Sequence, residues 1–173
     1  VVVLRGDHNS LNSGLGILKT LLPKELPSWL WWNGRLDDAP ELLFQLASAQ
    51  RRLILDTALG EPLKCLELLT SRIASGQAVN DLNWLRLRNW RETLAMVFDP
   101  PDRRNSLSHV VRLDIDIEGN HHAQGLLLAS WIAERLNWNL TISSQKEDAS
   151  ISAQFQRPDG GIVQLSLIPL PVG

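Results

Sequence analysis

The sequence has 173 residues, and its 17 Lys and Arg against 19 Asp and Glu leave a formal net charge of −2. Nucleic acids and anionic membranes attract dense positive charge, which this chain lacks, so we expect neither as a partner. The hydrophobic content of 44% is enough for a folded core, and no apolar run reaches the roughly 20 residues that span a bilayer.

The chain opens on Val1–Leu4, a β-branched run that predicts a strand and, with no initial methionine, suggests a fragment of a longer protein. Glycine, asparagine and serine predict a loop over Gly6–Gly16, and Ile17–Leu22 predicts a short helix. A single cysteine, Cys65, and the lack of a secretory signal indicate a cytoplasmic protein.

An aromatic strand with at least one buried face is predicted over Ser28–Trp32, followed by the turn signal Asn33-Gly34. Asp38 is expected to cap a helix that runs to about Arg52. The apolar stripe of that helix is expected to contain Leu42, Leu46 and Ala49.

A continuous apolar run, Leu53–Asp56, is typical of a central parallel strand. The next helix is predicted over Pro62–Ala74, with Leu66, Leu69 and Ile73 buried together. Alternating strands and helices predict a small layered α/β unit with right-handed crossovers over residues 1–78.

A boundary is expected near Ser75–Val79, before a helix from about Asn83 to Phe98 that Asp99-Pro100-Pro101 must end. One broad side of this helix is apolar and also contains Arg91. The apolar residues on that side are Trp84, Leu87, Trp90, Leu94, Val97 and Phe98. An unpaired buried guanidinium costs several kcal/mol. We therefore expect Arg91 to pair within the fold, reach water or contact another protein.

The remaining residues predict a second unit, over 79–173, of α+β type with a mixed or antiparallel sheet. Alternation predicts a half-exposed strand over His109–Glu118, and a helix follows over His122–Leu136. Three more strands are predicted at Asn139–Gln145, Ile151–Gln156 and Ile162–Ile168, the last two joined by a hairpin turn at Pro158–Gly161. The core side of the helix is expected to contain Leu126, Ala129, Ile132, Ala133 and Leu136, while Leu127 and Trp131 share its far side.

Signatures of catalysis and cofactor binding are missing from the sequence. It contains no Walker phosphate loop, nucleophile elbow, paired-cysteine zinc site or HExxH helix. We therefore predict a protein that is not an enzyme and has no cofactor and no metal site. The alternative is a sensor or an unrecognised enzyme, with a small-molecule site at the carboxyl ends of the first parallel strands, near Arg5–His8 and Asp56-Thr57.

Two helical surfaces are candidates for binding another protein. Tryptophan and arginine are enriched where proteins grip each other, and the chain has seven tryptophans. We expect the centre of one surface to contain Trp84, Trp90 and Arg91, with Arg86 and Arg88 at its rim. Leu127 and Trp131 would form a second contact. Packing inside the fold is the alternative for each apolar member.

Several segments in order along the chain resemble the OpcA family of glucose-6-phosphate dehydrogenase assembly proteins, and together they cover nearly the whole sequence. The segments are Trp31-Trp32-Asn33-Gly34, Leu53–Asp56, Asp81–Trp84 with Arg86, Trp90-Arg91-Glu92, Phe98-Asp99 and Leu126–Trp138. The resemblance implies a non-catalytic partner that binds glucose-6-phosphate dehydrogenase and favours its active oligomer in the oxidative pentose phosphate pathway, without a cofactor. The tryptophan-rich composition suggests a cyanobacterial member.

Cyanobacterial members of the family are linked to thioredoxin control through cysteines, so the resemblance implies such control for the full-length protein. Within these residues Cys65 is the only cysteine, on a predicted helix. We expect it to be a small buried hydrophobic group rather than part of a redox switch.

Overall fold

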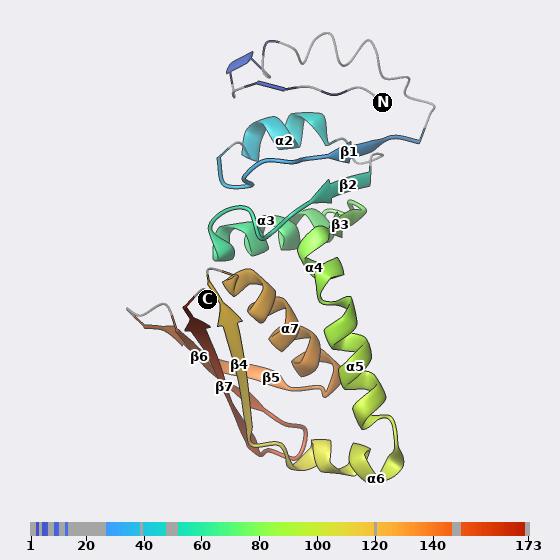
Figure 1. Ribbon diagram of the computed structural model, residues 1–173, viewed down its shortest axis with the longest axis vertical. Coiled ribbons are helices and arrows are strands. Elements are labelled where there is room, and N and C mark those ends of the chain that lie inside the picture. Colours follow the sequence, from blue (N-terminus) through green and yellow to red (C-terminus); the bar gives the residue numbers. More distant parts are fainter. Residues whose placement is uncertain are drawn as a thin grey trace. The chain divides into compact units, whose positions relative to one another are not determined.

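A computed structural model describes residues 3, 5–6, 9–10, 13, 27–38, 40–47, 52–119, 121–146 and 150–171. It divides the chain into two compact units, Val1–Leu82 and Asn83–Gly173. Figure 1 shows the course of the chain through both units. Among the described helices, none has both the length and the hydropathy that crossing a bilayer requires.

The first unit contains a parallel sheet in the order β1-β2-β3 (Figure 1). The strands are β1 (Trp29–Trp31), β2 (Arg52–Leu55) and β3 (Val79–Asp81). Leu53 and Leu55 are fully buried in β2, which pairs with a neighbour on both sides. This confirms the predicted central parallel strand, since such strands are apolar on both faces.

Two helices of the first unit, α2 (Pro40–Leu46) and α3 (Pro62–Ala74), connect these strands. The predicted extension of α2 to Arg52 is wrong, because the amide of Arg52 donates to the carbonyl of Ser28 (3.1 Å) in the parallel ladder. Leu46 is buried as predicted, together with Leu43. The side chain of Leu42 and all of Ala49 lie outside the described residues.

The bounds of α3 match the prediction, and Glu61 caps it by accepting from the amides of Leu63 (3.1 Å) and Lys64 (2.9 Å). Cys65 and Leu69 are its buried residues. The predicted burial of Ile73 is wrong, since this side chain is more than half exposed. Leu69, one turn earlier, is the last buried residue of the helix.

The prediction of at least one buried face for β1 is met only in part, since Leu30 is half-buried on one face while Trp29 and Trp31 are more than half exposed on the other. The guanidinium carbon of Arg52 lies 5.1 Å from the centre of the Trp29 ring, so a surface cation covers this ring. The third strand, β3, was not predicted from the sequence Val-Asn-Asp, because it is short and only its valine favours a strand.

Near the start of the chain the described residues do not support the predicted strand and loop. Val3 is exposed and lies in no strand, and Asn9, Ser10 and Ser13 are helical. The helix predicted over Ile17–Leu22 lies outside the described residues.

The second unit contains a mixed sheet in the order β4-β7-β6-β5, as predicted (Figure 1). The strands are β4 (Arg112–Glu118), β5 (Asn139–Gln145), β6 (Ile151–Gln156) and β7 (Ile162–Leu170). In this sheet β4 and β7 pair in parallel, whereas β7 with β6 and β6 with β5 pair antiparallel. β4 begins three residues later than predicted, because the chain first forms α6 (Pro101–Arg104) and a 3₁₀ helix at Asn105–His109.

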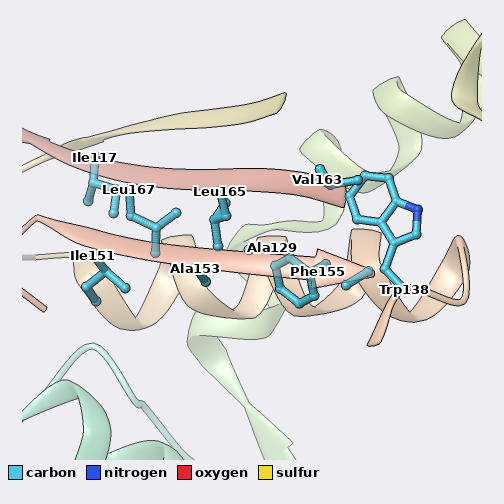
Figure 2. Packing of buried hydrophobic residues seen from close by; sticks show 10 residues of the cluster. Ile117, Ala129, Trp138, Ile151, Ala153, Phe155, Val163, Leu165 and Leu167 are labelled. Carbon is cyan, nitrogen blue, oxygen red and sulfur yellow. The ribbon is translucent and has the colours of Figure 1, made fainter. Parts of the chain in front are cut away.

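One face of this sheet is covered by α7 (His122–Arg135), within one residue of the predicted helix. Figure 2 shows side chains of β6 and β7 in rows between the strands and α7, with Trp138 at one end. The buried cluster consists of Ile117, Ala129, Ala133, Trp138, Ile151, Ala153, Phe155, Val163, Leu165 and Leu167. Leu126, Ile132 and Leu136 pack against it, so the predicted core side of α7 is confirmed.

The hairpin predicted between the last two strands is present. The amide of Arg157 donates to the carbonyl of Gly161 (2.8 Å), and Gly160 has a φ of 86°, which glycine adopts without strain. The division between the units lies four residues after the predicted boundary at residue 78, because β3 pairs with β2 and so belongs to the first sheet.

Candidate protein-docking surface

The predicted helix over 83–98 is two helices, α4 (Leu82–Arg86) and α5 (Arg88–Phe98). Leu87 separates the two helices, because its ψ of −3° departs from the usual helical value of about −42°. It is almost fully buried. The single helix was therefore a wrong prediction, and α4 and α5 together are called the docking helices below.

The apolar side of the docking helices is only partly covered. Trp84, Leu94, Val97 and Phe98 are half-buried, and α5 has no fully buried residue. Trp90 is 61% exposed, although the helical periodicity places it beside these residues. A helix whose apolar side remains accessible can bind another surface.

Trp84 and Arg91 contact each other across the break at Leu87. The guanidinium carbon of Arg91 lies 3.5 Å from the centre of the Trp84 ring, and its Nη2 donates to the Trp84 carbonyl (3.4 Å). Burial lowers the pKa of Arg91, because it disfavours the charged form. Arg91 was predicted to pair within the fold, reach water or contact another protein. It pairs within the fold, but with the Trp84 ring and the Trp84 carbonyl instead of a carboxylate.

The two arginines predicted at the rim are both exposed. Arg88 forms an ion pair with Glu92 (2.7 Å) across one turn of α5, which raises the pKa of Arg88. Exposed pairs of this kind contribute little to stability, because water screens them. Arg86 ends α4.

Leu127 and Trp131, the second predicted contact, are both half-buried on α7. They are less accessible than Trp90, so the structure ranks the docking helices above α7 as an open apolar surface. Sequence reasoning missed Leu85 and Met96, which are more than half exposed on the docking helices. Residue identity carries no signal for them, because leucine and methionine are usual core residues.

The alternative small-molecule site would lie where β2 and β3 end. There the amide and hydroxyl of Thr57 donate to the two carboxylate oxygens of Asp81 (3.0 and 2.8 Å), and the amide of Ala58 donates to Asp56 Oδ1 (3.1 Å). These hydrogen bonds give the buried carboxylates a structural role at the strand ends. The other predicted part, Arg5–His8, includes two residues outside the described part of the chain.

Metal binding has no support in the described part of the chain, where no three His, Cys, Asp or Glu side chains are grouped to hold an ion.

Cys65 is fully buried in the first unit, as predicted for a small hydrophobic group. Its Sγ contacts the carbonyl of Leu59 at 3.7 Å. Burial raises the pKa of the thiol to about 11, and the negative charges of Asp37 and Glu61 act in the same direction. Reactivity requires the thiolate, so the native thiol is protected.

We expect native Cys65 to react with an alkylating reagent at pH 8 far more slowly than the unfolded chain, because about one thiol in a thousand is ionised. Mass spectrometry of the 173-residue chain with and without denaturant measures both rates. Equal rates would contradict the burial. Since the folded pKa is the higher one, unfolding becomes easier as the pH rises from about 9 to about 11, where only the unfolded thiol ionises.

Comparison with known proteins matches the chain to two family models of the glucose-6-phosphate dehydrogenase subunit. Residues 1–71 match the N-terminal domain of that subunit, and residues 77–171 match its C-terminal domain. Three similar proteins, each described as a putative OxPP cycle protein OpcA, come from Synechocystis sp. (32% identity), Nostoc punctiforme (34%) and Synechococcus elongatus (33%). Each comparison covers 99% of this chain but only 37–39% of the length of the relative.

Proposed function

Because this chain belongs to the OpcA family of glucose-6-phosphate dehydrogenase subunits, as the resemblance predicted, we propose that the protein binds glucose-6-phosphate dehydrogenase and favours its active oligomer. The protein would act without catalysing a reaction itself. Support comes from the family descriptions, which name a subunit of that enzyme, and from the accessible apolar side of the docking helices.

The mechanism we propose is preferential binding to the active form. A partner shifts a conformational equilibrium only by its difference in affinity for the two forms, and a difference of about 1.4 kcal/mol changes the ratio tenfold. A single buried aromatic anchor supplies that much. The observation that carries the proposal is the exposure of Trp90 on α5, with Leu85 and Met96 also exposed on the docking helices.

Other candidate residues would have smaller roles in this proposal. Arg86 and Arg88 would lie at the rim of the contact, where charges mainly set the rate and the salt dependence of association. Leu127 and Trp131 would form a second contact, weaker because both are already half-buried.

The experiment mixes the full-length protein with the glucose-6-phosphate dehydrogenase of the same organism. Size-exclusion chromatography measures co-elution, and an assay of NADPH formation measures the rate with and without the protein. We expect a stoichiometric complex and a higher rate. Thermal stabilisation by sugar phosphates or nucleotides without any effect on the dehydrogenase would favour the alternative small-molecule sensor.

Replacing Trp90 by alanine is expected to weaken binding about tenfold or more, because an exposed tryptophan that becomes buried at an interface is a typical hot spot. Calorimetric titration measures the dissociation constant. The matched control is Trp31→Ala, since Trp31 has the same exposed fraction of 61% but lies on β1 of the first unit. Unchanged affinity of the Trp90 variant, with a loss in the Trp31 variant, would move the contact away from the docking helices.

A further inference from the structure

Arg91 is held in one place by the docking helices. Its guanidinium lies against the Trp84 ring, with 3.5 Å between the guanidinium carbon and the ring centre, and Nη2 donates to the Trp84 carbonyl. An arginine fixed in this way loses less conformational freedom on binding than a free surface arginine. The stack is therefore suited to present a charge to a partner.

Arg91 forms no ion pair with a carboxylate among the described residues, although the charge of Glu92 acts on it from nearby. The nearby acid, Glu92, is bound at 2.7 Å by Arg88, and farther along the chain the charge of Arg104 lies 3.8 Å from Asp99. Nε of Arg91 is buried without a hydrogen-bond acceptor. Leaving a charged donor unsatisfied is unfavourable, so a carboxylate that reached this guanidinium would be bound strongly.

The neighbour of Arg91 supplies the second part of a recognition site. Trp90 precedes it in α5 and is exposed, while Leu94, one turn later, is half-buried. A surface that combines an uncompensated cation with an exposed indole fits an acidic side chain next to an apolar one. A nucleic acid would need several cations, and here the other arginines of α5 and α6 have contacts of their own.

We propose that Arg91, positioned by Trp84, receives a carboxylate of the partner enzyme, whose adjacent apolar side chain packs against Trp90. This inference rests on the proposed function, because the partner is the dehydrogenase. It adds the chemistry of the contact. Arg91 recognises the partner, and Trp84 is a positioning residue that does not itself enter the partner's surface.

The first test is Arg91→Gln in the full-length protein, with binding to the dehydrogenase measured by calorimetry at low and high salt. We expect the affinity to fall about tenfold to a hundredfold, as for the loss of a charge-assisted hydrogen bond. The salt dependence should also become weaker, because one ion pair no longer forms. Arg91→Lys is expected to recover only part of the affinity, since an ammonium offers no planar fork.

The matched control variant removes another guanidinium that stacks on an aromatic ring. In Arg72→Gln the lost guanidinium is the one whose carbon lies 3.4 Å from the centre of the Phe44 ring in the first unit. This variant is expected to bind within about twofold of the wild type, because Arg72 does not belong to the docking helices. A loss as large as in Arg91→Gln would overturn the assignment to Arg91.

The positioning role of Trp84 is tested by a double-mutant cycle. Trp84→Leu should weaken binding, but Trp84→Leu with Arg91→Gln should bind no more weakly than Arg91→Gln alone, because both act through one contact. Additive losses would overturn this role. Melting temperatures of all variants show whether the fold persists, and a collapse of the fold in Arg91→Gln would place Arg91 in the structure instead.

The outcomes separate the two proposals. If the wild-type protein does not bind the dehydrogenase, the proposed function itself fails. A different result would overturn only the role of Arg91 in binding a carboxylate. In that case the wild type binds and Trp90→Ala weakens the complex, but Arg91→Gln leaves the affinity and its salt dependence unchanged.

Discussion

Replacing Leu167 by alanine is expected to lower the free energy of unfolding by about 2–5 kcal/mol, with the value in the upper part of that range. Leu167 has no exposed surface and lies in β7 within the cluster covered by α7 (Figure 2). Truncation removes its transfer free energy and leaves a cavity that the surrounding strands fill only partly. Denaturant unfolding followed by circular dichroism measures the change.

The matched control for this variant is Leu140→Ala in β5. Leu140 belongs to the same sheet but is 58% exposed. The same truncation there should change the stability by no more than about 0.5 kcal/mol. Equal losses in the two variants would show that the solution structure does not have this core.

Replacing Gly125 by alanine is expected to destabilise the second unit by about 1–3 kcal/mol, although alanine normally favours a helix. A Cβ atom at this position of α7 would lie 2.5 Å from Ile117 Cδ1 and 3.0 Å from Ile117 Cγ1. Ile117 belongs to the buried cluster, where close packing leaves little free space. The added methyl group therefore forces either the isoleucine side chain or the helix to move. Thermal and denaturant unfolding measure the loss.

A second substitution provides the internal control for Gly125→Ala. Ile117→Val removes Cδ1, the atom nearest to the added Cβ, and alone costs about 0.5–1.5 kcal/mol. In this background Gly125→Ala should cost less than in the wild type, because the 2.5 Å contact is gone and only the 3.0 Å contact with Cγ1 remains, so the two changes are not additive. Additive losses would indicate that α7 does not approach β4 at this glycine.

Where local patterns were strong, the fold followed from the sequence. Strand β4, the glycine-rich turn between β6 and β7 and helix α3 were predicted within a few residues, because side-chain period and turn chemistry act between near neighbours. The family membership was likewise recognised from the order of short segments and was confirmed by the family models.

Predictions failed where a short segment depends on distant partners. Val79–Asp81 is a strand because β2 offers it hydrogen bonds, and Arg52 belongs to β2 and not to α2 because it pairs with β1. The aromatic pattern of β1 likewise did not specify which of its faces is covered, and Trp29 and Trp31 are on the exposed face of this edge strand. These outcomes depend on which strands pair and on which faces other elements cover, and neither can be read from a short stretch of sequence.

The sequence by itself determined that Trp84, Trp90 and Arg91 share one side at helical spacing, which made them the central candidates. Only the tertiary structure decided their separate roles. Leu87 is buried where the helix breaks, and the Arg91 guanidinium lies on the Trp84 ring while Trp90 is exposed. The physical reason is that periodicity specifies direction around a helix axis, whereas burial and charge pairing depend on which other atoms occupy that direction.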